Sequence, residues 1–251
     1  MMNFKPICSA RTVAWLSFFA AILAAWIIMF TMARMSGVDV IGRPVGINMM
    51  PMATFWALFP MWSMMMAAMM LPTMVPTLSN YEDLMRSADG SRVGWFGVLL
   101  GYFIVWIGFA ALISMVQVGL LAGGLIDSLG IAASRWFAAV LLILVGIYQL
   151  SRIKEICQGV CHSPMMYFVG HWKKGGRGGF RMGLVLGSYC VGCCWGFMSL
   201  GFVGGVMSLA WMGIATLFMI IEKLPQIGHQ VTKPLGILLI VVGLSIAVTS
   251  M

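Results

Sequence analysis

Charged residues are scarce in this sequence. Only 9% of its 251 residues carry a charge and 61% are hydrophobic, whereas an ordinary soluble domain has about 25% charged residues. A soluble protein of this size could not cover its surface with so few polar groups. A lipid-facing surface removes the difficulty, because apolar side chains then also belong on the outside. The sequence therefore predicts an all-α, polytopic transmembrane bundle without a sizeable soluble domain.

The sequence also lacks the usual marks of an enzyme. It has no nucleophile–base pair of recognisable spacing and no nucleotide-binding glycine motif. An enzyme is therefore the least favoured class, although redox chemistry at a bound metal stays open. The net charge of +8 could indicate a nucleic-acid partner. The basic residues cluster at the ends of apolar segments instead, so orientation in a membrane explains them better and no nucleic acid is expected.

Seven apolar segments approach the length of about 20 residues that crosses a bilayer. Only a glycine-rich stretch separates the fifth segment from the sixth. These two segments could form a tight helical hairpin or one re-entrant unit, so six spans is the alternative. With the N-terminus in the cytoplasm, the 15 Lys and Arg residues divide twelve to three between the two sides, which predicts an N-in/C-out orientation. Residues 152–180, rich in Gly, Lys and Arg, are expected to form a flexible cytoplasmic loop. The spans are placed near residues 13–33, 53–75, 94–118, 132–151, 181–202, 205–222 and 234–250.

Methionine is concentrated around the second span, where ten of the 25 methionines fall between residues 49 and 74. Met66, Met70 and Met74 follow one another at i, i+4 and i+8 on a helix. Met69 lies beside them, and Pro72 would kink the helix. Thioether sulfur is a soft, neutral donor that favours Cu(I) and costs little to place in a bilayer. Packing explains each methionine taken alone, but the cluster favours metal handling.

Five of the six cysteines form two groups with helical spacing, whereas Cys8 stands alone. Cys190, Cys193 and Cys194 stand at i, i+3 and i+4, so their thiols converge on one side of a helix. Glycines lie close to the same stripe and let a neighbouring helix approach closely, so we expect the thiols to face the bundle interior. Cys157 and Cys161 stand one turn apart just after the fourth span. The two groups either share one ion or act in sequence, with the pair receiving the ion and the trio holding it.

A soft metal ion is the ligand that these groups favour. Thiolate is the ligand form, and a bound cation offsets the cost of deprotonating a thiol in apolar surroundings. Zinc is the alternative, since four thiolates suit it, but the nearby thioethers favour Cu(I). His162 adjoins Cys161 and is a candidate to complete the site. Glu222, which precedes Lys223 at the end of the sixth span, is expected to form an ion pair at the membrane surface.

Four of these features together resemble a known family: the methionine run at 64–72, the Cys157/Cys161 pair, the cysteine segment at 189–195 and the acid–lysine pair at 222–223. The chain is similar to bacterial proteins described as predicted metal-binding integral membrane proteins. Their defining domain is catalogued as of unknown function, and some members are labelled copper chaperones. The resemblance covers roughly spans two to six. It implies metal binding in the inner membrane of a bacterium and gives no established reaction.

Three functions remain in competition. The first is a copper-binding membrane protein that stores, delivers or chaperones Cu(I), with a membrane cuproenzyme as a candidate recipient. The second is a metal transporter, with which the prolines of the second span and the glycine-rich break after the fifth are compatible. The third is an accessory subunit of a larger membrane complex. Abundant Met, Trp and Gly suit the helix–helix contacts of such a subunit.

Overall fold

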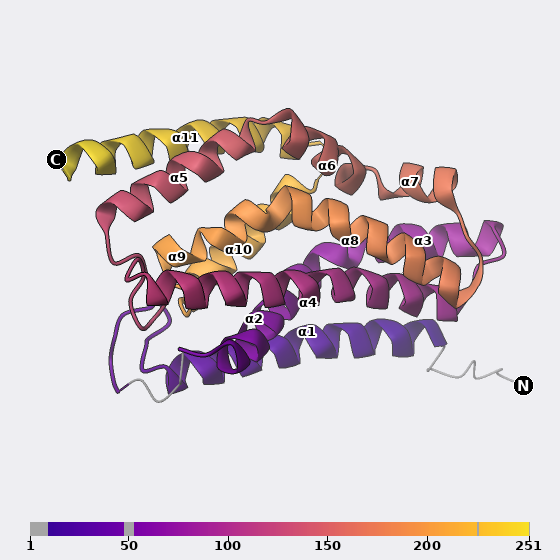
Figure 1. Ribbon diagram of the computed structural model, residues 1–251. Helices are drawn as coiled ribbons and strands as arrows, with labels where there is room; N and C mark the ends of the chain where they lie inside the picture. Colours follow the sequence, from indigo (N-terminus) through magenta and orange to yellow (C-terminus); the bar gives the residue numbers. More distant parts are fainter. Residues whose placement is uncertain (1–9, 48–52, 225, 251) are drawn as a thin grey trace, which may run out of the picture.

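A computed structural model of the chain describes residues 10–47, 53–224 and 226–250 (Figure 1). Cys8 and the methionines at 49, 50 and 52 lie outside these residues. The regular elements of the described part are helices, as the composition predicts. They are α1 (Ala10–Met35), α2 (Phe55–Met70), the 3-10 turn η1 (Pro72–Met74), α3 (Val75–Ser87), α4 (Arg92–Ala122), α5 (Arg135–Gln149), α6 (Arg152–His162), α7 (Pro164–His171), α8 (Gly175–Ser199), α9 (Gly201–Gly204), α10 (Leu209–Glu222) and α11 (Gly228–Thr249).

Five helical segments of the described chain are long and apolar enough to cross a membrane: Ala10–Met35, Phe55–Met85, Arg92–Ala122, Gly175–Gly204 and Gln230–Thr249. A sixth results if α5 and α6, which meet at a 61° bend, are counted as one span. The remaining apolar helix, α10, has only 14 residues. The helical class is therefore confirmed, whereas seven spans and the N-in/C-out orientation stay predictions.

The segment 152–180 is mostly helical, so the expectation of a flexible loop there is wrong. The side chain of Ser151 caps α6 by accepting a hydrogen bond from the backbone N–H of Lys154, which is a typical way to begin a helix. Pro164 occupies the first turn of α7, where its missing N–H costs nothing. These two helix-start signals outweigh the glycines of the segment.

Glycines bring α4 and α8 into the most extensive contact between any two helices of the described chain. A Cβ atom on Gly179 would collide with the backbone carbonyl of Gly94, and one on Gly183 with that of Val98. The two backbones therefore touch where a larger residue would hold them apart. The expected glycine stripe of the cysteine helix is thus confirmed, and its partner is α4. The stripe turns Cys190 and Cys194 inward, each with 1% of its surface exposed.

Three helices break near the middle of the bundle (Figure 1). Pro72 ends α2 and begins the turn η1, as the predicted kink requires. The second break is the bend between α5 and α6. The third lies between α10 and α11, where residues 223, 224, 226 and 227 are not helical. The first break places the polar side chain of Thr73, and the second that of Lys154, in the interior of an otherwise apolar bundle.

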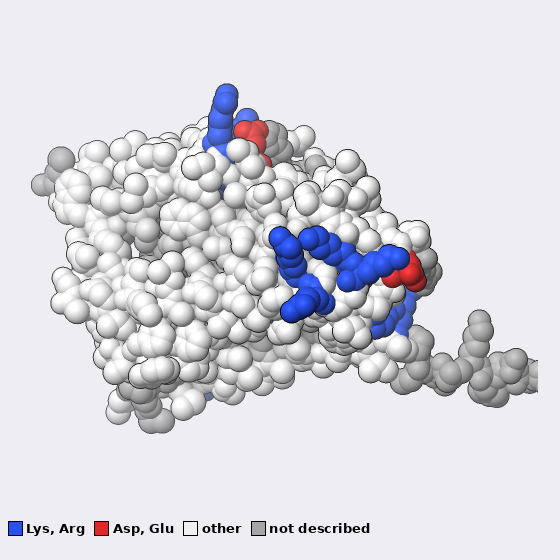
Figure 2. Space-filling view, turned by 45° about the vertical axis from the view of Figure 1, so that its right-hand side comes forward, with Lys and Arg blue, Asp and Glu red and all other residues white. Residues whose placement is uncertain are grey.

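A cluster of basic residues lies at one end of the molecule. Figure 2 turns the end that carries α3, α7 and the start of α8 forward and shows Lys and Arg clustered there, with a second, smaller group of charged residues at the top of the view. Lys173, Lys174, Arg177 and Arg181, at and just before the start of α8, are all exposed. Such a patch is typical of the cytoplasmic end of a membrane protein.

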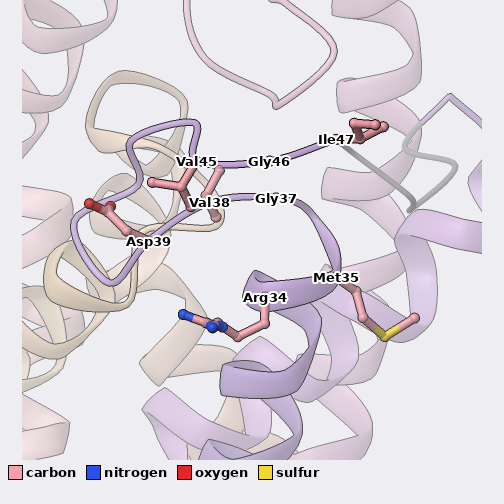
Figure 3. Close-up of a pocket in the computed structure, with 8 residues that line it drawn as sticks. All are labelled: Arg34, Met35, Gly37, Val38, Asp39, Val45, Gly46 and Ile47. Carbon is pink, nitrogen blue, oxygen red and sulfur yellow. The ribbon is translucent and has the colours of Figure 1, made fainter.

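Two loops at the other end share one geometry. Asp39 accepts hydrogen bonds from the backbone N–H groups two and four residues later, and Asp127 does the same in the loop between α4 and α5. The first loop and the end of α1 border an open hollow of about 440 Å³ (Figure 3). None of the predicted site residues lines it.

Candidate metal centre

Three thiols meet where α6 packs against α8. The Sγ atoms of Cys161, Cys190 and Cys193 all lie within 4.8 Å of one another, and Cys161 is 3.7 Å from Cys193. Three sulfurs bound to one ion at about 2.3 Å lie about 4 Å apart if they form a plane around it. The observed spacing is close to this value. The thiols can therefore reach one ion with small side-chain adjustments.

Cys194 adjoins this group, with its Sγ atom 3.3 Å from that of Cys193. Its side chain is buried, so the described residues place four thiols in one small region. The sequence predicted the trio on α8 as one unit. The structure adds Cys161 from α6 to it and places Cys194 on its edge.

Lys223 brings a positive charge to the thiols. Its Nζ atom donates to the Sγ of Cys190 at 3.1 Å and to the Oγ1 of Thr73 at 2.7 Å. Thr73 lies in the turn that Pro72 creates, and the Tyr102 hydroxyl is 3.0 Å from the same sulfur. Lys223 at the end of α10 and Tyr102 in the middle of α4 thus contact one cysteine, and Thr73 holds Lys223 in place. An ammonium beside sulfur lowers the cost of a thiolate in apolar surroundings.

A cavity of about 10 Å³ opens beside these groups. Cys161, Cys190 and Lys223 line it, together with Met74 from η1 and Tyr102 from α4. Its volume is about that of one water-sized sphere. The donors around it are soft sulfur atoms, which suit a soft cation. They must bind it as thiolates, because the ammonium of Lys223 in the same lining would otherwise repel the cation.

A buried ion pair holds the cysteine-bearing helices together. Lys154 of α6 and Glu222 of α10 are 2.8 Å apart, with 1% and 3% of their side chains exposed. The Nζ atom of Lys154 also donates to the backbone carbonyl of Cys193 at 3.0 Å. Thr232 of α11 donates to the same carboxylate at 2.9 Å. This network fixes α6 against α8, α10 and α11, and so it positions Cys161 beside Cys193.

The prediction of an ion pair for Glu222 at the membrane surface is wrong in its place, since the partner is Lys154 and both groups are buried. One signal in the sequence points to this pair. Neighbouring residues of a helix point in different directions. Because Glu222 and Lys223 are adjacent in the chain, they are expected to point to different neighbours and to have separate partners.

Two other candidate ligands, Cys157 and His162, lie near the three close thiols but outside their group. Cys157 of α6 lies against the backbone of Gly192 on α8, where a Cβ atom on that glycine would be 2.8 Å from its sulfur. It does not belong to the group of three close thiols. His162 does not turn toward the thiols; its Nε2 atom lies 2.6 Å from the backbone carbonyl of Glu222.

The predicted methionines divide in the same way. Met74 lines the small cavity with Cys161 and Cys190. Met66, Met69 and Met70 are buried in α2, one to two turns before Met74. Metal binding by any of the predicted residues stays a prediction, but the geometry favours Met74 among the methionines.

These features define the chain as a helical bundle with apolar helices of membrane-spanning length and a buried site of cysteine thiols that could hold a metal. Residues 59–246, about three quarters of the chain, match the model of the PpoB2 family, whose description is copper chaperone. The chain belongs to this family, and the resemblance found in the sequence is confirmed. No curated protein and no solved structure matches the chain.

Proposed function

We propose that this protein is a multi-pass protein of the bacterial inner membrane that binds Cu(I) through Cys161, Cys190 and Cys193 and passes it to a copper-requiring partner. The observation that carries the proposal is the meeting of three thiols from two helices within 4.8 Å. The copper chaperone description of the family supports the choice of metal.

The donor set favours Cu(I) over zinc. Soft thiolate and thioether ligands select Cu(I), and the cavity offers three sulfurs from Cys161, Cys190 and Met74. The nearest harder groups are engaged elsewhere, since Glu222 binds Lys154 and His162 lies on a carbonyl. Zinc becomes competitive if Cys194 joins as a fourth thiolate, because zinc prefers four ligands in a tetrahedron.

Metal analysis of protein purified without oxygen and under reducing conditions tests this function. We expect about one copper per chain, and loss of that copper when Cys161, Cys190 and Cys193 are all replaced by Ser. The matched control is Cys157→Ser, which removes a cysteine from the same helix but outside the close group, and it should keep the copper. Protein that binds only zinc, or a triple variant with unchanged copper, would contradict the proposal.

Transport of the metal is the second candidate, because the helix breaks converge on the thiols. Thr73 from the first break and Lys223 from the third both bind near Cys190, and Lys154, just after the second, binds the carbonyl of Cys193. Broken helices that meet at a buried site are typical of secondary transporters. Copper uptake into sealed vesicles separates the two functions, since a chaperone binds copper without moving it across.

A further inference from the structure

An apolar groove runs between α1, α2 and α4, away from the thiols. Its volume is about 610 Å³, and all the residues that line it are apolar. Small side chains create the space, chiefly Ala21, Ala24 and Ala25 of α1. Phe96 and Phe103 of α4 form the opposite wall. The volume lies in the range of sites that bind small molecules, about 300–1,000 Å³.

The surface beside the groove is suited to lipid. Leu23 and Ile27 of α1 and Leu100 of α4 are 64%, 63% and 56% exposed. Such residues on a helix of membrane-spanning length face acyl chains when the helix lies in a bilayer. The groove therefore opens toward the hydrocarbon region, and an acyl chain is an occupant of matching polarity.

An arginine pair lies at the end of the groove where α1 and α4 begin. Arg92 pairs with Glu82, and the Nε atom of Arg11 lies 3.2 Å from the same carboxylate oxygen. Trp15 donates to the other oxygen at 2.7 Å. One carboxylate thus faces two guanidinium groups, which leaves one positive charge without a partner in this cluster.

Part of the pair is open to a ligand. The Arg11 side chain is 53% exposed. The Arg92 side chain is 27% exposed, although its Nη1 atom is buried and has no hydrogen-bond partner among the described residues. A ligand can therefore reach Arg11 and the accessible part of Arg92. Guanidinium groups match the geometry of a phosphate.

The two features are correctly spaced for one molecule. Phe96 follows Arg92 by four residues in α4, a rise of about 6 Å along the helix. Ala21 follows Arg11 by ten residues in α1, about 15 Å. Both helices begin at the same end of the bundle (Figure 1), and the rings of Trp15 and Trp95 join them with centroids 5.8 Å apart. A charged head group at the arginines would therefore continue into an acyl chain in the groove.

We propose that the groove and its arginine end bind one anionic phospholipid, with the phosphate at Arg11 and Arg92 and an acyl chain between α1, α2 and α4. This site is separate from the copper proposal and rests on the membrane location and on the predicted N-in orientation. A lipid fits better than a second copy of the chain. The unpartnered charge attracts an anion, whereas another copy carries its own net charge of +8. The basic end of the bundle also matches the anionic cytoplasmic leaflet.

Native mass spectrometry tests whether the site recognises an anionic head group. The full chain is incubated with equal amounts of dioleoyl phosphatidylglycerol and dioleoyl phosphatidylcholine and is then released from detergent in the spectrometer. The wild type should retain one phosphatidylglycerol. Arg11→Gln should reduce its preference for that lipid about fivefold, whereas the control Arg135→Gln, at the start of α5, should not. Equal retention of both lipids by the wild type would overturn recognition of the anion.

The groove has its own variant and control. Ala24→Trp fills the groove from its open side and should abolish retention of the lipid, whereas Ala20→Trp, also exposed on α1 but outside the groove lining, should retain it. Melting temperatures confirm that the variants fold. Unchanged lipid retention in Ala24→Trp would refute lipid binding in the groove. A wild-type dimer that Ala24→Trp dissociates would also refute it, since a second copy of the chain would then occupy the groove. Copper content, measured on the same samples, stays the same if the two sites are independent.

Discussion

The buried ion pair allows a quantitative test of how the thiol site is held together. Replacing Lys154 by Met leaves the Glu222 carboxylate, 3% exposed, without its cation. Removing one member of a buried pair costs about 3–5 kcal/mol, because the remaining charge stays buried and unpaired. For a chain of this size, each kcal/mol lowers the melting temperature by about 2–4 °C. We therefore expect Lys154→Met to melt about 6–20 °C below the wild type.

A double-mutant cycle in detergent provides the assay. Glu222→Met should destabilise the protein by a similar amount, since it leaves the ammonium of Lys154 unpaired. The double variant should lose less than the sum of the two single variants, because no buried charge remains. Melting followed by loss of soluble, monodisperse protein gives all three values.

The chain also contains a matched exposed pair. Lys174 and Asp89 are 3.0 Å apart with 64% and 89% of their side chains exposed, so Lys174→Met should cost less than about 1 kcal/mol. Equal small effects of Lys154→Met and Lys174→Met would refute the buried network. Additive losses in the double variant would show that Lys154 and Glu222 do not interact.

Three further outcomes are expected. Gly183→Ala should lower the melting temperature, because its Cβ would collide with the Val98 carbonyl. The control Gly119→Ala, whose Cβ meets no atom within 4 Å, should be neutral or stabilising by up to about 1 kcal/mol. Thermal melting compares the two variants, and equal losses would contradict the close packing of α4 and α8. Lys223→Met should weaken Cu(I) binding about 10- to 100-fold, since a hydrogen bond to a charged group contributes about 1.5–3 kcal/mol. Competition with a Cu(I) chelator measures the affinity, and an unchanged affinity would exclude an electrostatic role for Lys223. Lys223→Arg should recover part of the affinity in the same assay, and a variant as weak as Lys223→Met would point to size instead of charge.

The helical class and the inward thiols could be predicted because both follow from local rules. Low charge excludes a soluble surface, and the spacing of Cys190, Cys193 and Cys194 fixes one face of a helix. The glycines on the same face predict close contact with a neighbour. These inferences need only the periodicity of a helix and the cost of placing polar groups in lipid.

The rest of the centre depends on contacts between distant segments. Cys157 and Cys161 are one turn apart and both lie against α8, as their spacing suggests, but one meets Gly192 and the other meets Cys193. The register of α6 on α8 decides this difference, and Lys154 determines that register through its bonds to Glu222 and the Cys193 carbonyl. Sequence spacing contains no information about such a crossing.

The direct test of the central claim is X-ray absorption at the copper edge of protein loaded with Cu(I) without oxygen. We predict a first shell of two or three sulfur atoms at about 2.3 Å, as is usual for metal–thiolate bonds. That shell should change in Cys161→Ser as well as in Cys190→Ser, because the ligands come from two helices. A shell of nitrogen or oxygen atoms, or one that Cys161→Ser leaves unchanged, would contradict it.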